Sequence, residues 1–239
     1  MSTFVLVHGA WSGSFTWKKV RPLLVRQGHV IYTPSLTGLG ERAHLTSPQV
    51  NLSLHIQDVV NAVWYEDLRD ITLVGYSYGG MVVTGALDHL GSRVKHLVYL
   101  DAFVPGDGQS LQDLTGRPQE IAESFPGGEW LLPPMPREYD DPADVAFTAP
   151  RRVSHPAGCF NEPVRLRTPL EERGISLTYI KATGEPRPEG TGGPFWVAAD
   201  RTKADPRWRY EEIATNHMIP FNRPQEFVDI VTSVAAPAG

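Results

Sequence analysis

Residues 71–80 read Ile-Thr-Leu-Val-Gly-Tyr-Ser-Tyr-Gly-Gly, and this segment constrains the fold more than any other in the chain. Its first half is apolar and β-branched, as in a short strand that is buried on both faces. Its second half sets Ser77 between Gly75 and Gly79, and the run Met81 to Leu90 that follows is typical of a helix. A serine in such a tight strand-to-helix turn exposes its hydroxyl, which makes Ser77 a candidate nucleophile. The alternative role is that of a helix N-cap in a glycine-rich turn.

Strand and helix patterns alternate along most of the chain. Short apolar runs predict strands at residues 4–7, 29–32, 71–74, 94–100, 175–180 and 208–213. Helical spacing of apolar residues predicts helices at 15–27, 54–64, 81–90, 195–202 and 227–234. Gly28 should end the first helix, and Asn51 or Ser53 should cap the second. The alternation predicts an α/β fold with a mostly parallel sheet of about six strands, flanked by helices.

The pattern is interrupted in the middle of the chain. Residues 105–169 are rich in Pro and Gly and show no long periodicity, as in Phe125-Pro126-Gly127-Gly128. We interpret this segment as an inserted lid, and residues 1–104 with 170–239 as the core of a single α/β domain.

Composition excludes several classes of function. The formal net charge is -5, and the 22 Lys and Arg residues are scattered among 27 acidic ones, so nucleic acid is not an expected partner. Cys159 is the single cysteine, which rules out an intramolecular disulfide and does not support a Cys-based metal site. The sequence has no apolar run of the length that spans a bilayer and no signal-like start, so we expect a cytoplasmic protein that does not bind membranes. We expect no cofactor and no metal, and the oligomeric state stays open, with a homodimer as one alternative.

The nucleophile needs a base and oxyanion donors. His217 lies between the last predicted strand and the last helix, where the histidine of a Ser-acid-His chain order falls, so it is the candidate base. His8 follows the first strand and should shape its loop by hydrogen bonding. Because the carboxyl ends of parallel strands meet at one edge, the amides of Ala10 and Tyr78 are the expected oxyanion hole. The remaining histidines are expected in structural or solvated roles: His29, His44, His55, His89, His96 and His155.

Two carboxylates compete for the place beside the base. Glu185 follows the predicted strand 175–180, and Asp101 follows the strand 94–100. Either side chain can orient an imidazole and stabilise its charged form. Glu185 can also be a solvated loop residue, and Asp101 can cap a turn. We favour Glu185 and keep Asp101 as the alternative acid.

The sequence resembles the α/β-hydrolases, in particular the branch with hydroxynitrile lyases, plant methyl-esterases and bacterial pyrethroid-hydrolysing carboxylesterases. The likeness covers nearly the whole chain apart from the central insertion. It is carried by residues 4–11, 34–42, the 75–79 turn, 99–105 and 216–218. In that branch the acid follows a Cys-Thr-Glu-Asp-like segment, so the resemblance implies Glu185, although the loop 186–194 is longer than usual. Cyanohydrin lyases of the branch carry a lysine after the catalytic histidine, whereas this chain has Met218, as the esterases do.

The resemblance and the residues together predict a cofactor-independent serine carboxylesterase or lactonase that acts on a small hydrophobic ester. A carbon-carbon lyase or cyclase using the same Ser77 and His217 is the alternative, and a non-catalytic ligand receptor is a third hypothesis. Candidates for the lining of the substrate pocket, which can equally be core residues, are Trp11, Phe103, Phe125, Trp130, Leu131, Met135 and Phe160.

Overall fold

The computed structural model describes residues 1–116, 130–190 and 192–236. Its centre is a six-stranded sheet with the order β2-β1-β3-β4-β7-β8, in which every neighbouring pair is parallel. The strands are β1 (Thr3–Val7), β2 (Val30–Tyr32), β3 (Ile71–Tyr76), β4 (Val94–Leu100), β7 (Ser176–Ala182) and β8 (Trp208–Ile213). The predicted α/β fold with a mostly parallel sheet is confirmed.

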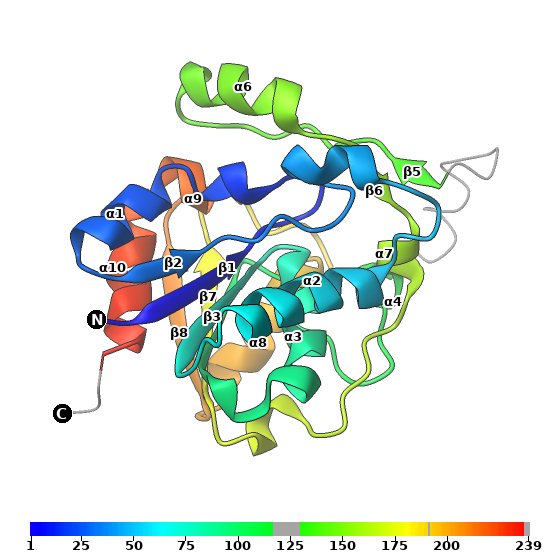
Figure 1. Ribbon diagram of the computed structural model, residues 1–239. Helices are drawn as coiled ribbons and strands as arrows, with labels where there is room; N and C mark the ends of the chain where they lie inside the picture. The colour runs from blue at the N-terminus through cyan, green and yellow to red at the C-terminus, as the bar shows by residue number, and fades with distance from the viewer. Residues whose placement is uncertain (117–129, 191, 237–239) are drawn as a thin grey trace.

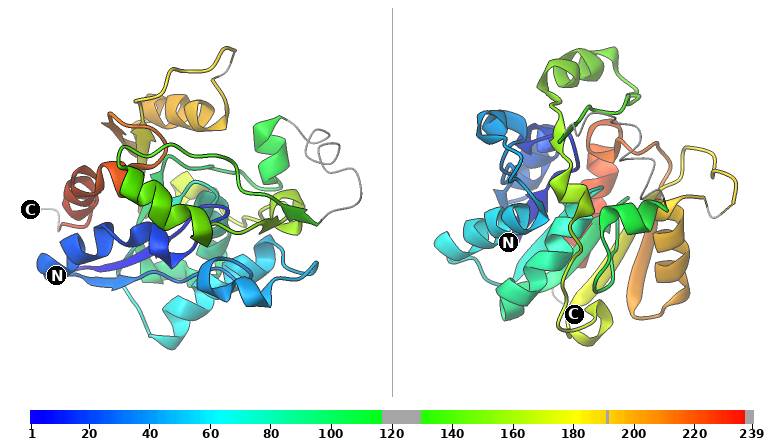
Figure 2. Two further views of the ribbon diagram at one scale, coloured as in Figure 1. Left: turned by 90° about the horizontal axis from the view of Figure 1, so that it is seen from above. Right: turned by 90° about the vertical axis from the view of Figure 1, so that its right-hand side faces the viewer.

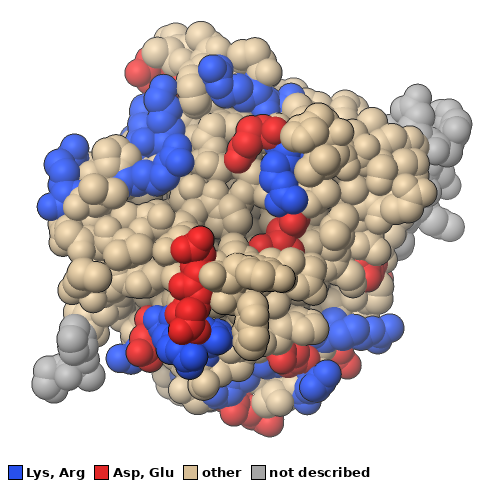
Figure 3. All heavy atoms as spheres, viewed as in Figure 1, with Lys and Arg blue, Asp and Glu red and all other residues tan. Residues whose placement is uncertain are grey.

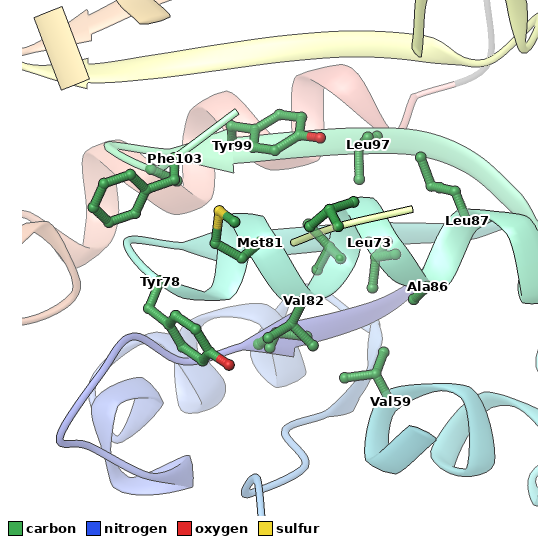
Figure 4. Packing of buried hydrophobic residues seen from close by; sticks show 14 of the residues in the cluster. Val59, Leu73, Tyr78, Met81, Val82, Ala86, Leu87, Leu97, Tyr99 and Phe103 are labelled. Carbon is green, nitrogen blue, oxygen red and sulfur yellow. The ribbon is translucent and has the colours of Figure 1, made fainter. Parts of the chain in front are cut away.

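Helices cover both faces of the sheet (Figures 1 and 2). The helices α1 (Val20–Arg26) and α10 (Pro224–Val234) pack on one face, and α2 (Leu52–Tyr65), α3 (Gly79–Leu90) and α8 (Pro194–Ala204) on the other. Strand β1 shows why both faces are apolar, since Phe4 and Leu6 enter one core and Val5 and Val7 the other. Figure 4 shows the second core between α3 and the strands β3 and β4, where Met81 and Val82 meet Leu73 and Leu97.

Local details differ from the predicted helices. The predicted helix 15–27 is a 3-10 turn, η1 (Ser14–Trp17), followed by α1, which Gly28 then ends with a positive φ of 81°. The predicted loop 34–49 contains a second 3-10 turn, η2 (Gly40–Leu45). Of the two cap candidates, Asn51 caps α2, because its side chain accepts a hydrogen bond from the backbone N–H of Leu54.

The chain between β4 and β7 adds no strand to the main sheet within its described residues. Its strands β5 (Leu131–Leu132) and β6 (His155–Pro156) form a separate antiparallel pair. Its helices and 3-10 turns are α4 (Leu111–Thr115), α6 (Pro142–Thr148), η4 (Ala149–Arg151), α7 (Gly158–Asn161) and η5 (Leu170–Glu172). Helix α6 lies above the sheet at the top of Figure 1, which agrees with a lid, and the exact bounds 105–169 stay a prediction.

None of the helices in the described ranges is long and apolar enough to cross a bilayer. On the face shown in Figure 3, acidic and basic side chains are interspersed among large uncharged areas. The cytoplasmic location stays a prediction.

Candidate active site

Ser77 occupies a strained turn between β3 and α3. Its φ is 57°, a left-handed conformation that non-glycine residues rarely adopt and that is common at functional sites. Two hydrogen bonds fix the turn against the end of β4: the Ser77 N–H donates to Leu100 O at 3.2 Å, and the Phe103 N–H donates to Ser77 O at 3.2 Å. The turn also needs a close approach of backbones at Gly80, where a Cβ would lie 2.1 Å from Phe103 O. The predicted strand-to-helix context of Ser77 is therefore present.

His217 lies in the loop between β8 and the short helix α9 (Ile219–Asn222), and it is buried. Its imidazole lies between two aromatic rings, stacked on Tyr76 at 4.9 Å and on Phe195 at 5.0 Å between ring centroids. The Tyr76 hydroxyl also donates a hydrogen bond to the His217 carbonyl at 2.8 Å. Ring and backbone are thus both held, and His217 lines the same cavity as Ser77.

Asp101, and not Glu185, lies beside the imidazole. The Nδ1–H of His217 donates to Asp101 Oδ2 at 2.6 Å. Asp101 is 2% exposed and has a φ of 40°, so the chain turns sharply at the end of β4 and directs the carboxylate towards the loop after β8. Glu185 is exposed in the loop after β7. The preference for Glu185 over Asp101 therefore does not agree with the geometry, because the two strand ends are close but only Asp101 faces inwards.

A buried lysine binds the other oxygen of the same carboxylate. Lys181, on β7, is 4% exposed, and its Nζ donates to Asp101 Oδ1 at 2.6 Å and to Ala182 O at 2.7 Å. The Ala182 N–H donates to Asp101 Oδ1 as well, at 3.3 Å. The sequence analysis did not single out Lys181. A lysine at the end of an apolar strand was the sequence feature that could have identified it, because a buried ammonium group needs an anion nearby.

Burial and neighbouring charges set the protonation of His217 and Asp101. Burial would raise the pKa of Asp101, but the hydrogen bond and charge of His217 and the Lys181 ammonium together bring the pKa below its usual value. Burial lowers the pKa of His217 below 6.5, and although Asp101 opposes this, Arg137 and Lys181 add to the lowering. An imidazole that is neutral at neutral pH, with Nδ1 protonated, leaves Nε2 free to accept a proton.

The two amides expected as an oxyanion hole lie in the loop after β1 and at the start of α3. In the described ranges, neither the Ala10 N–H nor the Tyr78 N–H donates to another protein group, so both stay available to a ligand. The loop presses against the nucleophile, because a Cβ on Gly9 would lie 2.9 Å from Ser77 Cβ. It is held by Trp11, whose N–H donates to His155 Nδ1 at 3.3 Å and whose indole N–H donates to Leu132 O at 2.8 Å. The pair β5 and β6 thus fixes the loop.

Other buried histidines support this region. His8 donates from Nδ1 to Gly9 O at 2.8 Å and accepts at Nε2 from the Leu36 N–H at 3.1 Å, as expected for a residue that shapes its loop. His55 donates from Nε2 to Thr37 O at 2.8 Å and accepts at Nδ1 from the Tyr78 hydroxyl at 2.9 Å.

Three buried side chains have donor atoms that a metal ion prefers. One ligand atom from each of His55, His155 and Cys159 lies within 4.8 Å of the others. Burial raises the pKa of the Cys159 thiol to about 12, and both nitrogens of His55 already bind protein groups. A metal ion would have to displace these hydrogen bonds and a thiol proton, so the donor set does not fit a metal as it stands.

The cavity at Ser77 is small and mixed in character. Of the candidate pocket residues, Trp11 lines it, Phe103 and Phe160 belong to the apolar core, and Phe125 lies outside the described residues. Met218 lines it next to His217. Two cationic side chains that the sequence analysis did not single out, Arg137 and Arg152, also line it.

Comparison with known proteins agrees with this architecture. The model of the alpha/beta hydrolase family matches residues 4–230. A carbendazim hydrolyzing esterase of Nocardioides sp. (strain SG-4G) is 35% identical, with 96% of this chain and 98% of that protein covered. An alpha-hydroxynitrile lyase of Arabidopsis thaliana is 25% identical over 97% of this chain and 96% of its own. A solved extracellular alpha/beta-hydrolase from a Paenibacillus species, said to share homology with tobacco salicylic acid binding protein 2, has a TM-score of 0.80 at 25% identity, with both chains fully covered at 100%. The chain is therefore an enzyme of the alpha/beta hydrolase family.

Proposed function

We propose that this enzyme hydrolyses small carboxylic esters through an acyl-enzyme on Ser77. The observation that carries the proposal is that Ser77 and the buried His217–Asp101 pair line or adjoin a single cavity, next to two unused backbone amides. The esterase that is 35% identical over nearly its whole length supports the same class of reaction.

In the first half of the reaction, Ser77 Oγ attacks the ester carbonyl carbon while His217 Nε2 takes the hydroxyl proton. The carbonyl oxygen becomes an oxyanion, which accepts hydrogen bonds from the Ala10 and Tyr78 amides. The ester C–O bond then breaks, and the leaving alcohol takes the proton from His217. In the second half, water attacks the acyl-enzyme by the same path and releases the acid and free Ser77.

Asp101 and Lys181 have different roles in orienting the base His217. Asp101 Oδ2 holds the proton on Nδ1 and stabilises the imidazolium that forms transiently. Lys181 binds the other oxygen, which holds the carboxylate in place, and its positive charge adds to the lowering of the His217 pKa that burial causes. Lys181 is thus a positioning residue that acts through Asp101.

Carbon-carbon lyase chemistry is the second candidate, because one relative is an alpha-hydroxynitrile lyase. Met218 stands where the cyanohydrin lyases of the resemblance carry a lysine, and its sulfur lies 3.6 Å from the Tyr76 hydroxyl oxygen. A thioether carries no positive charge with which to stabilise a departing cyanide ion. Ester hydrolysis is therefore preferred.

The test separates the two chemistries. Wild type and Ser77→Ala are compared on short-chain p-nitrophenyl esters, methyl esters, lactones and a cyanohydrin, and quenched reactions are analysed by intact mass. We expect an acyl adduct on wild type during turnover and a loss of kcat in Ser77→Ala of roughly 10⁴-fold or more, with unchanged thermal stability. Cyanohydrin cleavage without an acyl adduct would favour the lyase, and unchanged ester turnover in Ser77→Ala would overturn the proposal.

A further inference from the structure

The cavity at Ser77 carries an uneven charge. Arg137 and Arg152 line it together with Ser77 and His217, whereas no carboxylate is among its described lining residues. Both arginines come from the segment between β5 and β6, above the carboxyl ends of the strands. Two arginines thus line the cavity that Ser77 and His217 also line.

Neither guanidinium has an acidic partner in the described parts of the chain. Of the neighbouring carboxylates, Asp140 pairs with Arg223 at 2.5 Å and Asp144 with Lys19 at 2.5 Å, and the exposed Glu138 pairs with neither arginine of the cavity among the described residues. Arg152 donates from Nη1 to Met135 O at 2.6 Å, which leaves most of its five N–H donors without a protein acceptor.

Such an arrangement is costly for a merely structural pair. Burial lowers the pKa of Arg152, and the nearby Arg137 charge lowers it further, so the charged form of Arg152 is disfavoured where it stands. Other arginines of the chain do have acids, as Arg42 has Asp58 at 2.9 Å and Arg223 has Asp140. An anion placed between two guanidiniums would remove the repulsion and fill the free donors.

We propose that Arg137 and Arg152 form a subsite for a carboxylate, so that the substrate is a small ester that carries a second, ionised carboxyl group outside the scissile bond. The inference rests on the proposed ester hydrolysis and narrows its substrate class. Guanidinium suits this role because its planar fork donates two parallel hydrogen bonds to one carboxylate. The proposal adds an ionised group to the small hydrophobic ester that the sequence predicts.

The first part of the test compares matched esters by pH-stat. Monomethyl adipate and methyl hexanoate have the same acyl length and differ in the terminal carboxylate, which tests the acyl side. The pair 4-acetoxybenzoate and phenyl acetate tests the leaving-group side. For at least one pair, we expect wild type to favour the anionic ester in kcat/KM by roughly 10-fold or more.

The second part uses Arg137→Gln and Arg152→Gln, with Arg151→Gln as the matched control. Arg151 is exposed next to Arg152, does not line the cavity, and packs over the ring of Phe147 instead. We expect each pocket variant to lower the anionic-to-neutral ratio of kcat/KM by roughly 10- to 100-fold, mainly through KM. The control should keep the wild-type ratio.

An equilibrium measurement keeps the inference separate from the reaction. Monomethyl adipate should raise the melting temperature of Ser77→Ala, and this shift should disappear when Arg137→Gln is added. If wild type hydrolyses neither ester yet the shift depends on Arg137, the subsite stands and ester hydrolysis is wrong. If esters are hydrolysed with the same ratio in the pocket variants as in wild type, the carboxylate subsite is wrong.

Discussion

Replacing Asp101 by Asn should inactivate the enzyme through the tautomer of His217 and leave the backbone in place. Asn tolerates the left-handed φ of 40° that Asp101 adopts, so the turn after β4 should persist. The orientation of the new amide follows from its neighbours. The Lys181 ammonium and the Ala182 N–H both donate to the Oδ1 position, so only the amide oxygen can lie there.

The amide NH₂ must then occupy the Oδ2 position, 2.6 Å from His217 Nδ1 in the wild-type geometry. It forces Nδ1 to accept a hydrogen bond, which moves the imidazole proton to Nε2, where the Ser77 proton should arrive. We expect kcat to fall by about 10⁴-fold, or about 5 kcal/mol of transition-state stabilisation. The Lys181 charge also loses its counter-ion, which should lower the free energy of unfolding by about 3 kcal/mol.

The assay measures kcat/KM on an ester that the wild type hydrolyses, together with urea unfolding. Asp101→Asn with Lys181→Met should regain stability, because the unpaired charge is gone, but should not regain activity. Glu185→Gln is the matched control and should keep kcat within about threefold. Full activity of Asp101→Asn, or a large loss in Glu185→Gln, would refute the assignment of the acid.

Three further results are expected. Because burial lowers the pKa of His217, kcat/KM on a neutral ester should stay level from alkaline pH down through pH 6.5 and fall only below pH 6.5. A midpoint of this fall above pH 7 would contradict a His217 that is neutral at rest. Burial also lowers the pKa of His8 to about 4, so the unfolded chain binds more protons than the folded protein between pH 6.5 and 4. Urea unfolding should therefore show a loss of stability on acidification through that window, with roughly 3 kcal/mol coming from His8 alone. Equal free energies of unfolding at pH 6.5 and pH 4 would argue against this assignment. Gly80→Ala should lower the free energy of unfolding by roughly 1–3 kcal/mol in thermal unfolding, because its Cβ would lie 2.1 Å from Phe103 O. Gly106→Ala is the control and should stay near wild type, because its Cβ would meet only a flexible side chain at 3.4 Å.

The sequence by itself determined the sheet and two functional side chains. Short apolar runs separated by helical spacing are local patterns, and each predicted strand appears in the sheet. Ser77 was found because it directly follows a strand, and His217 because it lies in the loop after the last strand. The carboxyl ends of parallel strands meet at one edge, so position along the chain already implies that such residues lie close together.

The acid was decided only by tertiary structure. Glu185 and Asp101 both follow strands that are neighbours in the sheet, so strand order cannot separate them. The left-handed turn at Asp101 directs its carboxylate inwards, and the Lys181 ammonium on the neighbouring strand β7 binds it there. Glu185 stays exposed. These are interactions between residues 80 apart in sequence, and no local pattern encodes them.

The positive charge of the cavity could not be predicted from the sequence for the same reason. Arg137 and Arg152 lie in an irregular segment where period and propensity carry little information. Whether an arginine is paired with an acid or left unpaired depends on which acids lie near it, and that depends on how the segment folds over the sheet. The sequence therefore determined that Ser77 stands in a strand-to-helix turn, and the tertiary structure decided which carboxylate lies beside His217 and which charges line their cavity.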